Sequence, residues 1–352
     1  MAKNTILGID IGTDRLKLAL VDSNIVLQTT AAKMPENLLR EGRITSIDTM
    51  SGLISTTMKE NGIKASKAAL VLPNEMVYIK NVRMPMMTTD QLVYNLPFEF
   101  NDYITGEIKD YVFDYAVLPD DDAEKEADQE QASQEQADQT PAPGEEEEET
   151  LNLMAVGAER AVIDEAGEML RKAGLSLEKA APSICSYITL IREQYETLSQ
   201  YTNEFCILDL GFTATRMYMF EGDRHVATRV IEVGLSSLVR VIADLFNVEE
   251  HLAHTYMQSN FENCLEREEC RESYDNIAVE LMRAMNFYRF SNPNSALSDM
   301  WMCGGGAMIH PLNEAIGSML DMRLHTASEL VHDGDEIPDC NSFVQAIGIA
   351  CE

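Results

Sequence analysis

Basic residues are scarce in this sequence of 352 residues. It contains 27 Lys and Arg against 59 Asp and Glu, which gives a formal net charge of −32. Nucleic-acid binding needs clustered Lys and Arg that displace counterions from phosphates, and an anionic membrane surface attracts the same residues. The composition therefore excludes nucleic acid as a partner and argues against direct binding to a bilayer.

Paired cysteines and long apolar runs are also missing. The seven cysteines are scattered and form no CxxC motif, so we expect reduced thiols and no structural zinc site. No apolar stretch approaches the roughly 18 residues that span a bilayer, and the N-terminal MAKNTILGID lacks the core of a signal peptide. These absences predict a soluble chain. Glu250, His251 and His254 have no second ligand cluster nearby in sequence, so we interpret them as a solvated helix face.

Aromatic residues are absent from residues 119–150, which hold 14 acidic residues and one lysine. A segment of this composition cannot bury enough apolar surface to offset the entropy lost on ordering. We therefore predict a disordered acidic loop over 119–150. We interpret it as a solvated insertion and leave open a role in binding.

One motif occurs twice. ILGIDIG followed by RLKLALVD predicts a β-hairpin, and FCILDLGFTATRMYMFEG repeats it with Asp209 and Gly211 in the places of Asp10 and Gly12. With 45% hydrophobic residues, the chain can form two cores. The internal repeat therefore predicts two domains built on one plan.

A strand that ends in Asp and continues into Gly suits a nucleoside triphosphate. The carboxylate can hold Mg²⁺, usually through water, and the glycine lets backbone N–H groups approach phosphate oxygens. We therefore predict Asp10 and Asp209 as Mg²⁺ ligands facing each other across one site. Additional phosphate donors are predicted on the hairpins: Thr13, Lys17, Thr213 and Thr215. A later strand-Gly-Gly-Gly-Ala-helix unit, with Gly304, Gly305 and Gly306, can bring backbone against adenine or ribose.

The remaining sequence predicts strands and helices around these motifs. Between the repeats, strands are expected at KAALVLP, MVYIKNVRMP, DYVFDYAVL and LNLMAVGA. A helix over 88–100 contains Pro97, which should kink or end it, and a helix over 159–173 is followed by Gly174 as its C-terminal cap. After the second repeat, helices are expected at SSLVRVIADLF, at SYDNIAVELMRAMNFYRF, from about Pro311, and at SFVQAIGIA. The second of these helices has an apolar stripe of Ile277, Leu281, Ala284, Met285 and Tyr288.

With these motifs, the chain resembles the actin, Hsp70 and sugar-kinase superfamily, and within it the PilM-type type IV pilus assembly proteins related to FtsA. Further landmarks of the resemblance are PFEFNDYI, VFDYAVL, RKAGLSLEKAAP, MNFYRF, CGGGAMIHPLNEAI and QAIGIA. It implies an α/β, actin-like (ribonuclease-H-like) duplicated two-lobed nucleotide-binding fold with an inserted small α+β subdomain. Lobe I is expected over 1–70, 175–203 and 341–352, the inserted subdomain over 71–174, and lobe II over 204–340.

The resemblance also implies a function. Such proteins are cytoplasmic ATP-binding and Mg²⁺-binding scaffolds of the type IV pilus, or of a related type II secretion-like assembly platform. They bind the cytoplasmic tail of a single-pass, PilN-like inner-membrane protein, so that membrane association is indirect, and self-association stays open. By position, the first phosphate motif comprises Asp10, Gly12, Thr13 and Lys17, the second Asp209, Gly211 and Thr215, and the adenosine motif 304–306.

Three positions depart from the family pattern. Gly234, a predicted nucleotide contact, is followed by Leu235 instead of a second glycine. The helix EEHLAHT places Leu252 and Thr255 where relatives usually carry Glu and Lys for the nucleoside. The segment between the lobes, KAAPSICS, has Ala181 and Ser183 at positions that are usually acidic. Because neither side chain can act as a carboxylate base, we expect ATP binding with slow or absent hydrolysis.

Two other classes of function stay open. A small-molecule kinase would share both phosphate motifs, and it would need a carboxylate base such as Asp102 or Glu107. An FtsA-like cell-division or filament protein usually ends in an amphipathic basic helix, whereas this sequence ends at GIACE. We therefore expect any membrane contact at the inner face of the cell membrane to be made through a partner.

Overall fold

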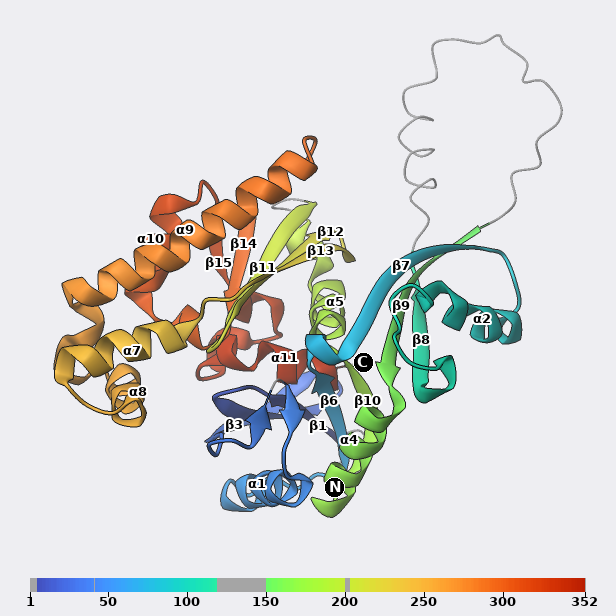
Figure 1. The fold of residues 1–352 in the computed structure, drawn as a ribbon, viewed down its shortest axis with the longest axis horizontal. Helices are drawn as coiled ribbons and strands as arrows, with labels where there is room; N and C mark the ends of the chain where they lie inside the picture. The colour runs from blue at the N-terminus through green and yellow to red at the C-terminus, as the bar shows by residue number, and fades with distance from the viewer. Residues whose placement is uncertain (1–4, 41, 119–149, 200–202, 352) are drawn as a thin grey trace, which may run out of the picture. The chain divides into compact units, whose positions relative to one another are not determined.

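The computed structural model describes residues 5–40, 42–118, 150–199 and 203–351. The predicted acidic loop over 119–150 lies outside the described residues, except for Thr150. The chain divides into two compact units: Met1–Pro73 with Ala166–Glu352, and Asn74–Glu165. Figure 1 shows both units as ribbons.

The first repeat builds a five-stranded sheet of the larger unit, in the order β10-β6-β1-β2-β3. Its strands are β1 (Thr5–Ile11), β2 (Arg15–Asp22), β3 (Ile25–Lys33), β6 (Lys67–Leu72) and β10 (Ser176–Pro182). β1 is antiparallel to β2 and parallel to β6, and β6 is parallel to β10. Helix α1 (Ile47–Glu60) and the short ribbon β4 (Leu39–Arg40) and β5 (Arg43–Ile44) complete this half.

The second repeat builds a sheet of the same design, in the order β13-β12-β11-β14-β15. Its strands are β11 (Glu204–Leu210), β12 (Thr215–Glu221), β13 (Arg224–Ile231), β14 (Asp299–Cys303) and β15 (Arg323–Thr326). In both sheets the first three strands form an antiparallel meander, and the last two run parallel to the first strand. The duplication predicted from the two hairpins is therefore confirmed.

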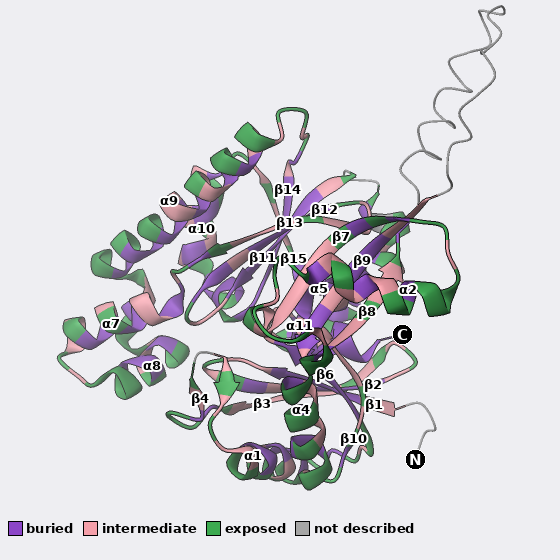
Figure 2. Ribbon diagram, turned by 45° about the vertical axis from the view of Figure 1, so that its right-hand side comes forward, coloured by how far each residue is buried: buried purple, intermediate pink, exposed green. Residues whose placement is uncertain are grey.

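Helices surround the second sheet. They are α7 (Leu235–Phe246), α8 (Glu250–Ser259), α9 (Glu268–Ser291) and α10 (His310–Met319), with the 3-10 turns η4 (Phe261–Glu266), η5 (Gly305–Met308), η6 (Ala327–Leu330) and η7 (Gly334–Glu336). The apolar stripe predicted on α9 is buried at Ile277, Leu281, Met285 and Tyr288, and its opposite face is exposed (Figure 2). The 3.6-residue period thus identified the packed face correctly.

Two helices join the halves of the larger unit: α5 (Ser183–Glu193), which continues into α6 (Tyr195–Leu198), and α11 (Cys340–Ala350). Helix α11 lies at the centre of the unit (Figure 1) and contacts β1, β2, β6 and β14. Glycines allow this packing, since a Cβ on Gly8 of β1 would lie 1.7 Å from the carbonyl oxygen of Ala346, and one on Gly348 would lie 2.4 Å from that of Ser186.

The smaller unit is an antiparallel sheet of β7 (Val77–Pro85), β9 (Thr150–Glu159) and β8 (Tyr111–Val117), in that order. It also contains α2 (Thr89–Asn95) and the turns η1 (Asn74–Met76), η2 (Leu96–Phe100) and η3 (Ile108–Asp110). The predicted helix over 88–100 stops being α-helical at Asn95 and continues as the 3-10 turn η2, which contains Pro97. This is the interruption expected of proline.

Helix α4 (Arg160–Lys172) leads back into the larger unit. Its last turns are bound there, because Ser51 Oγ donates to the carbonyl of Met169 at 2.9 Å and Lys172 pairs with Asp48 at 2.6 Å. The inserted subdomain was expected over 71–174, whereas the smaller unit comprises Asn74–Glu165. The bounds expected for the two lobes stay a prediction.

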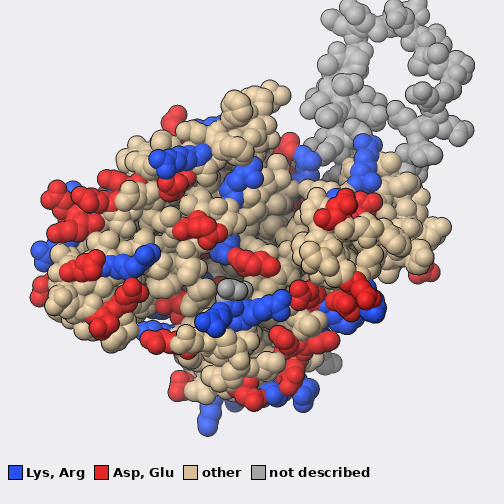
Figure 3. Space-filling model, viewed as in Figure 1, with Lys and Arg blue, Asp and Glu red and all other residues tan. Residues whose placement is uncertain are grey.

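The surface is predominantly acidic. Figure 3 shows Asp and Glu side chains spread over the visible face, with Lys and Arg between them. In the described part of the chain, none of the helices combines the length and the apolar character needed to cross a membrane.

Candidate functional site

The two predicted carboxylates occupy equivalent places in the two sheets. Asp10 is the penultimate residue of β1 and pairs with Lys17 across the first hairpin, and Asp209 is the penultimate residue of β11 and pairs with Arg216 across the second. Both residues are buried, with relative exposures of 8% for Asp10 and 7% for Asp209. Each carboxylate is thus held at the end of a buried strand, directly before a glycine turn.

Lys17 connects the two carboxylates electrostatically. Its Nζ donates to Asp10 Oδ2 at 3.0 Å. Burial opposes the charge on Lys17, but the charges of Asp10 and Asp209 outweigh that cost and raise its pKa. Lys17 therefore stays protonated, and the structure brings all three predicted residues into one charged cluster.

Burial raises the pKa of Asp209, and the charges of Lys17 and Arg216 oppose that shift. The amide of Gln345 on α11 also favours its charged form, since Nε2 donates to Asp209 Oδ2 at 2.9 Å. The same nitrogen lies 2.8 Å from the hydroxyl of Tyr187 on α5. Gln345 therefore links the second carboxylate to the two helices at the centre of the unit.

Sequence reasoning missed Arg216, Gln345 and Tyr187. Only Arg216 left a signal, because the residue opposite Asp209 corresponds to Lys17 opposite Asp10 in the repeat. Nothing in the sequence places Gln345 or Tyr187 beside Asp209, since they come from helices far away along the chain.

Cys303 and Tyr187 lie on the buried side of this cluster. The Tyr187 hydroxyl lies 3.4 Å from Cys303 Sγ, and Cys303 is paired with Asp209 between β14 and β11. Burial raises the pKa of both groups well above the ordinary range, so both are neutral. All seven cysteines of the chain are free thiols.

The glycines of the two hairpin turns (residues 12–14 and 211–214) lie close to the backbone across each turn, more closely at Gly211 than at Gly12. A Cβ on Gly12 would lie 3.1 Å from the carbonyl oxygen of Arg15, and one on Gly211 would lie 2.6 Å from that of Ala214. Thr13 and Thr213 are exposed within these turns. The turns thus present their backbone and one hydroxyl each toward solvent.

Gly234 is packed against the protein's own backbone and is not accessible to a ligand. A Cβ there would lie 2.5 Å from the carbonyl oxygen of Phe212, and the first N–H groups of α7, on Leu235 and Ser236, donate to the carbonyls of Gly211 and Phe212 at 3.1 and 2.8 Å. Gly234 therefore docks the second hairpin on α7. These helix N–H groups are already satisfied.

The glycine triplet lies against the end of β11. Gly304 has φ +84°, and a Cβ there would lie 2.5 Å from Asp209 Oδ1. A Cβ on Gly306 would lie 2.6 Å from Leu210 Cβ, whereas one on Gly305 would meet only Leu235 Cδ1 at 3.5 Å. The structure therefore places the triplet beside Asp209.

Thr215, predicted as a phosphate contact, forms a hydrogen bond within the protein. It is buried, and its hydroxyl donates to the carbonyl of Val233 at 2.8 Å. Ser183 stands at a position that is usually acidic in the family that the sequence resembles. It is also buried, and its hydroxyl lies 3.0 Å from the Tyr218 hydroxyl. The alternative bases Asp102 and Glu107 belong to the smaller unit.

The interpretation of α8 as a solvated face was wrong for His254. Glu250 and His251 are exposed, but His254 is only 5% exposed and its Nε2 lies 3.1 Å from Asp14 Oδ1 in the first turn. His254 shares the inner face of α8 with Ala253 and Met257. The spacing of Glu250, His251 and His254 along the helix could not reveal a carboxylate from the first repeat.

The charged cluster fits a magnesium-bound polyphosphate. Asp10 and Asp209 offer hard oxygen ligands, and Lys17 offers a cation for phosphate oxygens. A divalent cation bound between the two carboxylates would add to the positive charges of Lys17 and Arg216 that already act on Asp209. Among the residues that the structure describes, no three His, Cys, Asp or Glu side chains are grouped to hold a metal by themselves, so phosphate and water would have to complete the coordination.

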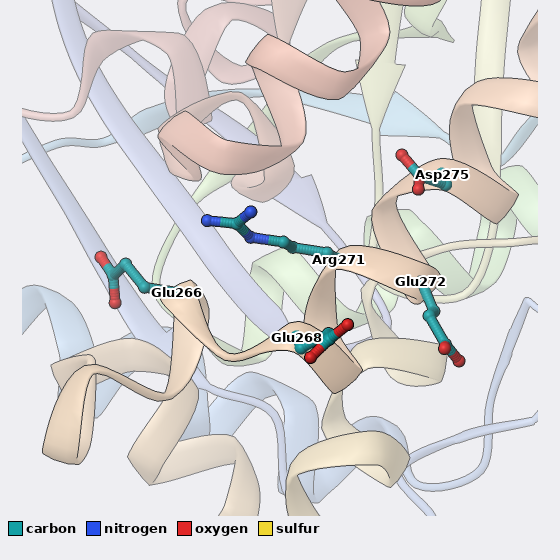
Figure 4. Close-up of a pocket in the computed structure, with 5 residues that line it drawn as sticks. All are labelled: Glu266, Glu268, Arg271, Glu272 and Asp275. Atoms are coloured by element: carbon teal, nitrogen blue, oxygen red, sulfur yellow. The ribbon is translucent and has the colours of Figure 1, made fainter.

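A surface hollow at the start of α9 is separate from this cluster. Its lining residues are Glu266, Glu268, Arg271, Glu272 and Asp275. Figure 4 shows that these side chains point in different directions and do not converge on one point. The hollow therefore has no feature of a binding site beyond its acidic lining.

Comparisons with known proteins agree with this architecture. The family model described as type IV pilus assembly protein PilM matches residues 8–134 and 138–333. A solved structure of a PilM-PilN type IV pilus biogenesis complex contains a chain 21% identical to this one, with a TM-score of 0.74 over 98% of this chain and 97% of that chain. No curated protein matches the sequence.

Two further structures have lower similarity. The ethanolamine utilization protein EutJ from Carboxydothermus hydrogenoformans is 13% identical, with a TM-score of 0.59 over 99% of this chain and 90% of that chain. A Bacteroides thetaiotaomicron protein with an actin-like ATPase fold is 11% identical, with a TM-score of 0.44 over 100% and 97%; at that score it adds nothing to the comparison. The predicted fold, actin-like with two mixed α/β lobes, is confirmed.

Proposed function

Because this chain belongs to the PilM family of type IV pilus assembly proteins, we propose that it is a Mg-ATP-binding scaffold of a pilus assembly platform. In this proposal it acts at the cytoplasmic face of the membrane and binds the cytoplasmic tail of a single-pass, PilN-like protein. The observation that carries the nucleotide part is the cluster of Asp10, Lys17 and Asp209 between the two hairpins.

Asp10 and Asp209 would hold Mg²⁺, and Lys17 would contact the phosphates. The exposed hydroxyls of Thr13 and Thr213 and the backbone of the two turns are available as additional donors. Bound Mg²⁺ supplies positive charge that balances the phosphates and the two carboxylates. Gly304–Gly306 would border the nucleoside, since the triplet lies beside Asp209.

Turnover is expected to be slow or absent. Hydrolysis needs a group that orients the attacking water or accepts its proton. Ala181 has no such group, and the Ser183 hydroxyl is buried against Tyr218. The bound nucleotide would therefore act mainly by stabilising one conformation of the protein.

The smaller unit offers a surface for the partner's tail. Five large apolar side chains on α2, η2 and their flanks are each more than half exposed, and we name them the aromatic patch: Met86, Val93, Tyr94, Phe98 and Tyr103. The rings of Tyr94 and Phe98 lie 5.9 Å apart. Large apolar groups exposed on adjoining segments of the chain are a feature of interaction sites on soluble proteins.

Charge defines the tail that would fit. The described residues of the smaller unit carry ten acidic and four basic side chains. Near the patch, Lys80 pairs with Glu99 at 3.2 Å and lies 5.4 Å from the ring centre of Tyr103. An apolar tail with basic residues would therefore complement this surface. The solved PilM-PilN complex makes a PilN-like tail the natural candidate.

Nucleotide binding is tested by thermal unfolding of the full chain with and without Mg-ATP. A ligand that binds the native state stabilises it by about 2.7 kcal/mol at a concentration 100 times its Kd, so wild type should unfold several degrees higher. Asp10→Ala and Asp209→Ala should each reduce that shift, whereas the exposed Asp321→Ala should preserve it. An unchanged melting temperature in wild type would remove the nucleotide from the proposal.

Tail binding is tested by titrating the full chain with a peptide of the PilN-like cytoplasmic tail. We expect micromolar or tighter affinity, about −8 kcal/mol or better. The double variant Tyr94→Ser, Phe98→Ser should weaken it at least tenfold. Phe290→Ser, an exposed aromatic of α9 in the larger unit, is the matched control. Equal binding by both variants would show that the tail docks elsewhere.

A further inference from the structure

His254 contacts both hairpin turns of the candidate site. Its Nε2 lies 3.1 Å from Asp14 Oδ1 in the first turn, and its ring meets the ring of Phe212 in the second turn edge-on, with centroids 5.5 Å apart. The two turns come from different sheets, and their backbones are the phosphate-facing elements of the proposed site. One buried imidazole therefore bridges the two turns.

The two partners are anchored in opposite halves of the larger unit. Asp14 is held in the first sheet, where its carbonyl accepts from the Met34 N–H at 2.8 Å. His254 is held on α8, which packs on α7, and the N-terminus of α7 is bonded to the second turn through Leu235 N and Gly211 O. Moving the halves apart would separate Asp14 from His254.

Asp14 is an unusual residue for a turn that faces phosphates, because a carboxylate there repels them. Burial tends to raise the pKa of Asp14, but the hydrogen bond and charge of His254, together with Arg15 and Lys33, lower it. Asp14 therefore stays ionised, and its charge is directed toward His254. Its other oxygen, Oδ2, lies 3.6 Å from Arg15 Nε.

We propose that Asp14 and His254 form a strap that holds the two hairpins together and slows nucleotide release. The inference rests on the proposed nucleotide site. A hydrogen-bonded pair whose side chains are 6% exposed at His254 and 20% exposed at Asp14 is costly to break, so truncation of either partner should loosen the hold on the two turns. The strap gives α8 a role in nucleotide exchange. Leu252 and Thr255, at the α8 positions expected to contact the nucleoside, are exposed.

The test combines two measurements on the full chain. The first is a double-mutant cycle of Asp14→Asn and His254→Gln on urea unfolding of the nucleotide-free protein, with His251→Gln on the exposed face of α8 as control. The second is the dissociation rate of a fluorescent ADP analogue in stopped flow. We expect each single variant to speed release about tenfold, the double variant to be no faster than either, and the control to match wild type.

Each result decides a different part. Additive effects of the two substitutions on unfolding, or release rates equal to wild type, would overturn the strap. If wild type binds no nucleotide, the proposed function fails, and the effect on nucleotide release fails with it. Non-additive unfolding energies in the nucleotide-free cycle would then still show whether Asp14 and His254 interact. Asp14 lies in a partly exposed turn, so the release rate of Asp14→Asn can still be measured if His254→Gln does not fold.

Discussion

Single residues at the centre of the candidate site take part in the protein's own packing. Asp209 illustrates this, because Gln345 bonds one of its oxygens and the backbone of Gly304 lies against the other. A carboxylate fixed on both sides is held in one orientation before any ligand arrives. Such preorganisation limits what must be ordered on binding.

Gly304→Ala should be far more costly than Gly305→Ala. Gly304 has φ +84° and ψ 177°, a region that is nearly restricted to glycine, and its Cβ would lie 2.5 Å from Asp209 Oδ1 and 2.7 Å from the carbonyl oxygen of Leu210. We expect a loss of about 2–4 kcal/mol in the free energy of unfolding. At Gly305 the nearest atom would be 3.5 Å from the added Cβ, so the free energy of unfolding should fall by only about 0.5 kcal/mol.

Urea denaturation of the two variants measures this difference. Equal losses would mean that the backbone of the triplet can relax, and that Asp209 is not held by Gly304.

At the scale of elements, the close crossing of α11 with α5 and β1 decides where the two halves meet. The crossing depends on backbone-to-backbone approach, with Gly8 and Gly348 at the contact points. Gln345 precedes Ala346, the residue that Gly8 contacts, so the position of α11 also sets the position of the amide that bonds the Asp209 carboxylate.

Two glycines within helices should respond to alanine with opposite signs. Gly348→Ala would place a Cβ 2.4 Å from the carbonyl oxygen of Ser186, and we expect it to destabilise the protein by about 1–3 kcal/mol. Gly52→Ala on the exposed side of α1 meets nothing within 4 Å. That change should stabilise by about 0.5–1 kcal/mol, because glycine is a poor helix former.

Thermal and urea unfolding of both variants give the comparison. A stabilising effect of Gly348→Ala would show that α11 can shift away from α5 at no cost, and the proposed coupling of α11 to Asp209 would then be lost.

At the scale of the whole molecule, the chain enters the smaller unit directly from the first sheet. Strand β6 ends at Leu72, next to the start of that unit, and β6 pairs with β1 so that Leu70 lies opposite Ile9. Ile9 precedes Asp10. Strand β6 therefore leads from the sheet that carries Asp10 into the unit that carries the aromatic patch.

Mg-ATP and the partner's tail should consequently affect each other's binding. We expect Mg-ATP to change the tail's affinity by about fivefold or more, and the tail to change the affinity for Mg-ATP by the same factor, since coupling free energies are reciprocal. Calorimetric titrations in both orders measure the two factors. Asp10→Ala should abolish the coupling but retain tail binding. Identical tail affinities with and without Mg-ATP would show that the two sites act independently.

The sequence by itself determined the duplication, the helix faces and the two carboxylates. Strand alternation, helix periodicity and the repeated Asp-x-Gly motif are local patterns, and they record which side of an element is buried and where a strand stops. The family resemblance likewise depended on motifs within short segments. These features need no knowledge of what lies next to them in space.

Only the tertiary structure decided which groups surround those carboxylates. Gln345 bonds Asp209, Cys303 pairs with it between strands, and Tyr187 bonds Gln345, because segments distant along the chain cross at one point. Thr215 and Gly234 contact backbone of the same half of the larger unit, and His254 is buried against Asp14 of the other half, because such partners depend on which elements pack together. Sequence spacing encodes the period of a helix or strand, but it does not encode which surfaces of different elements meet.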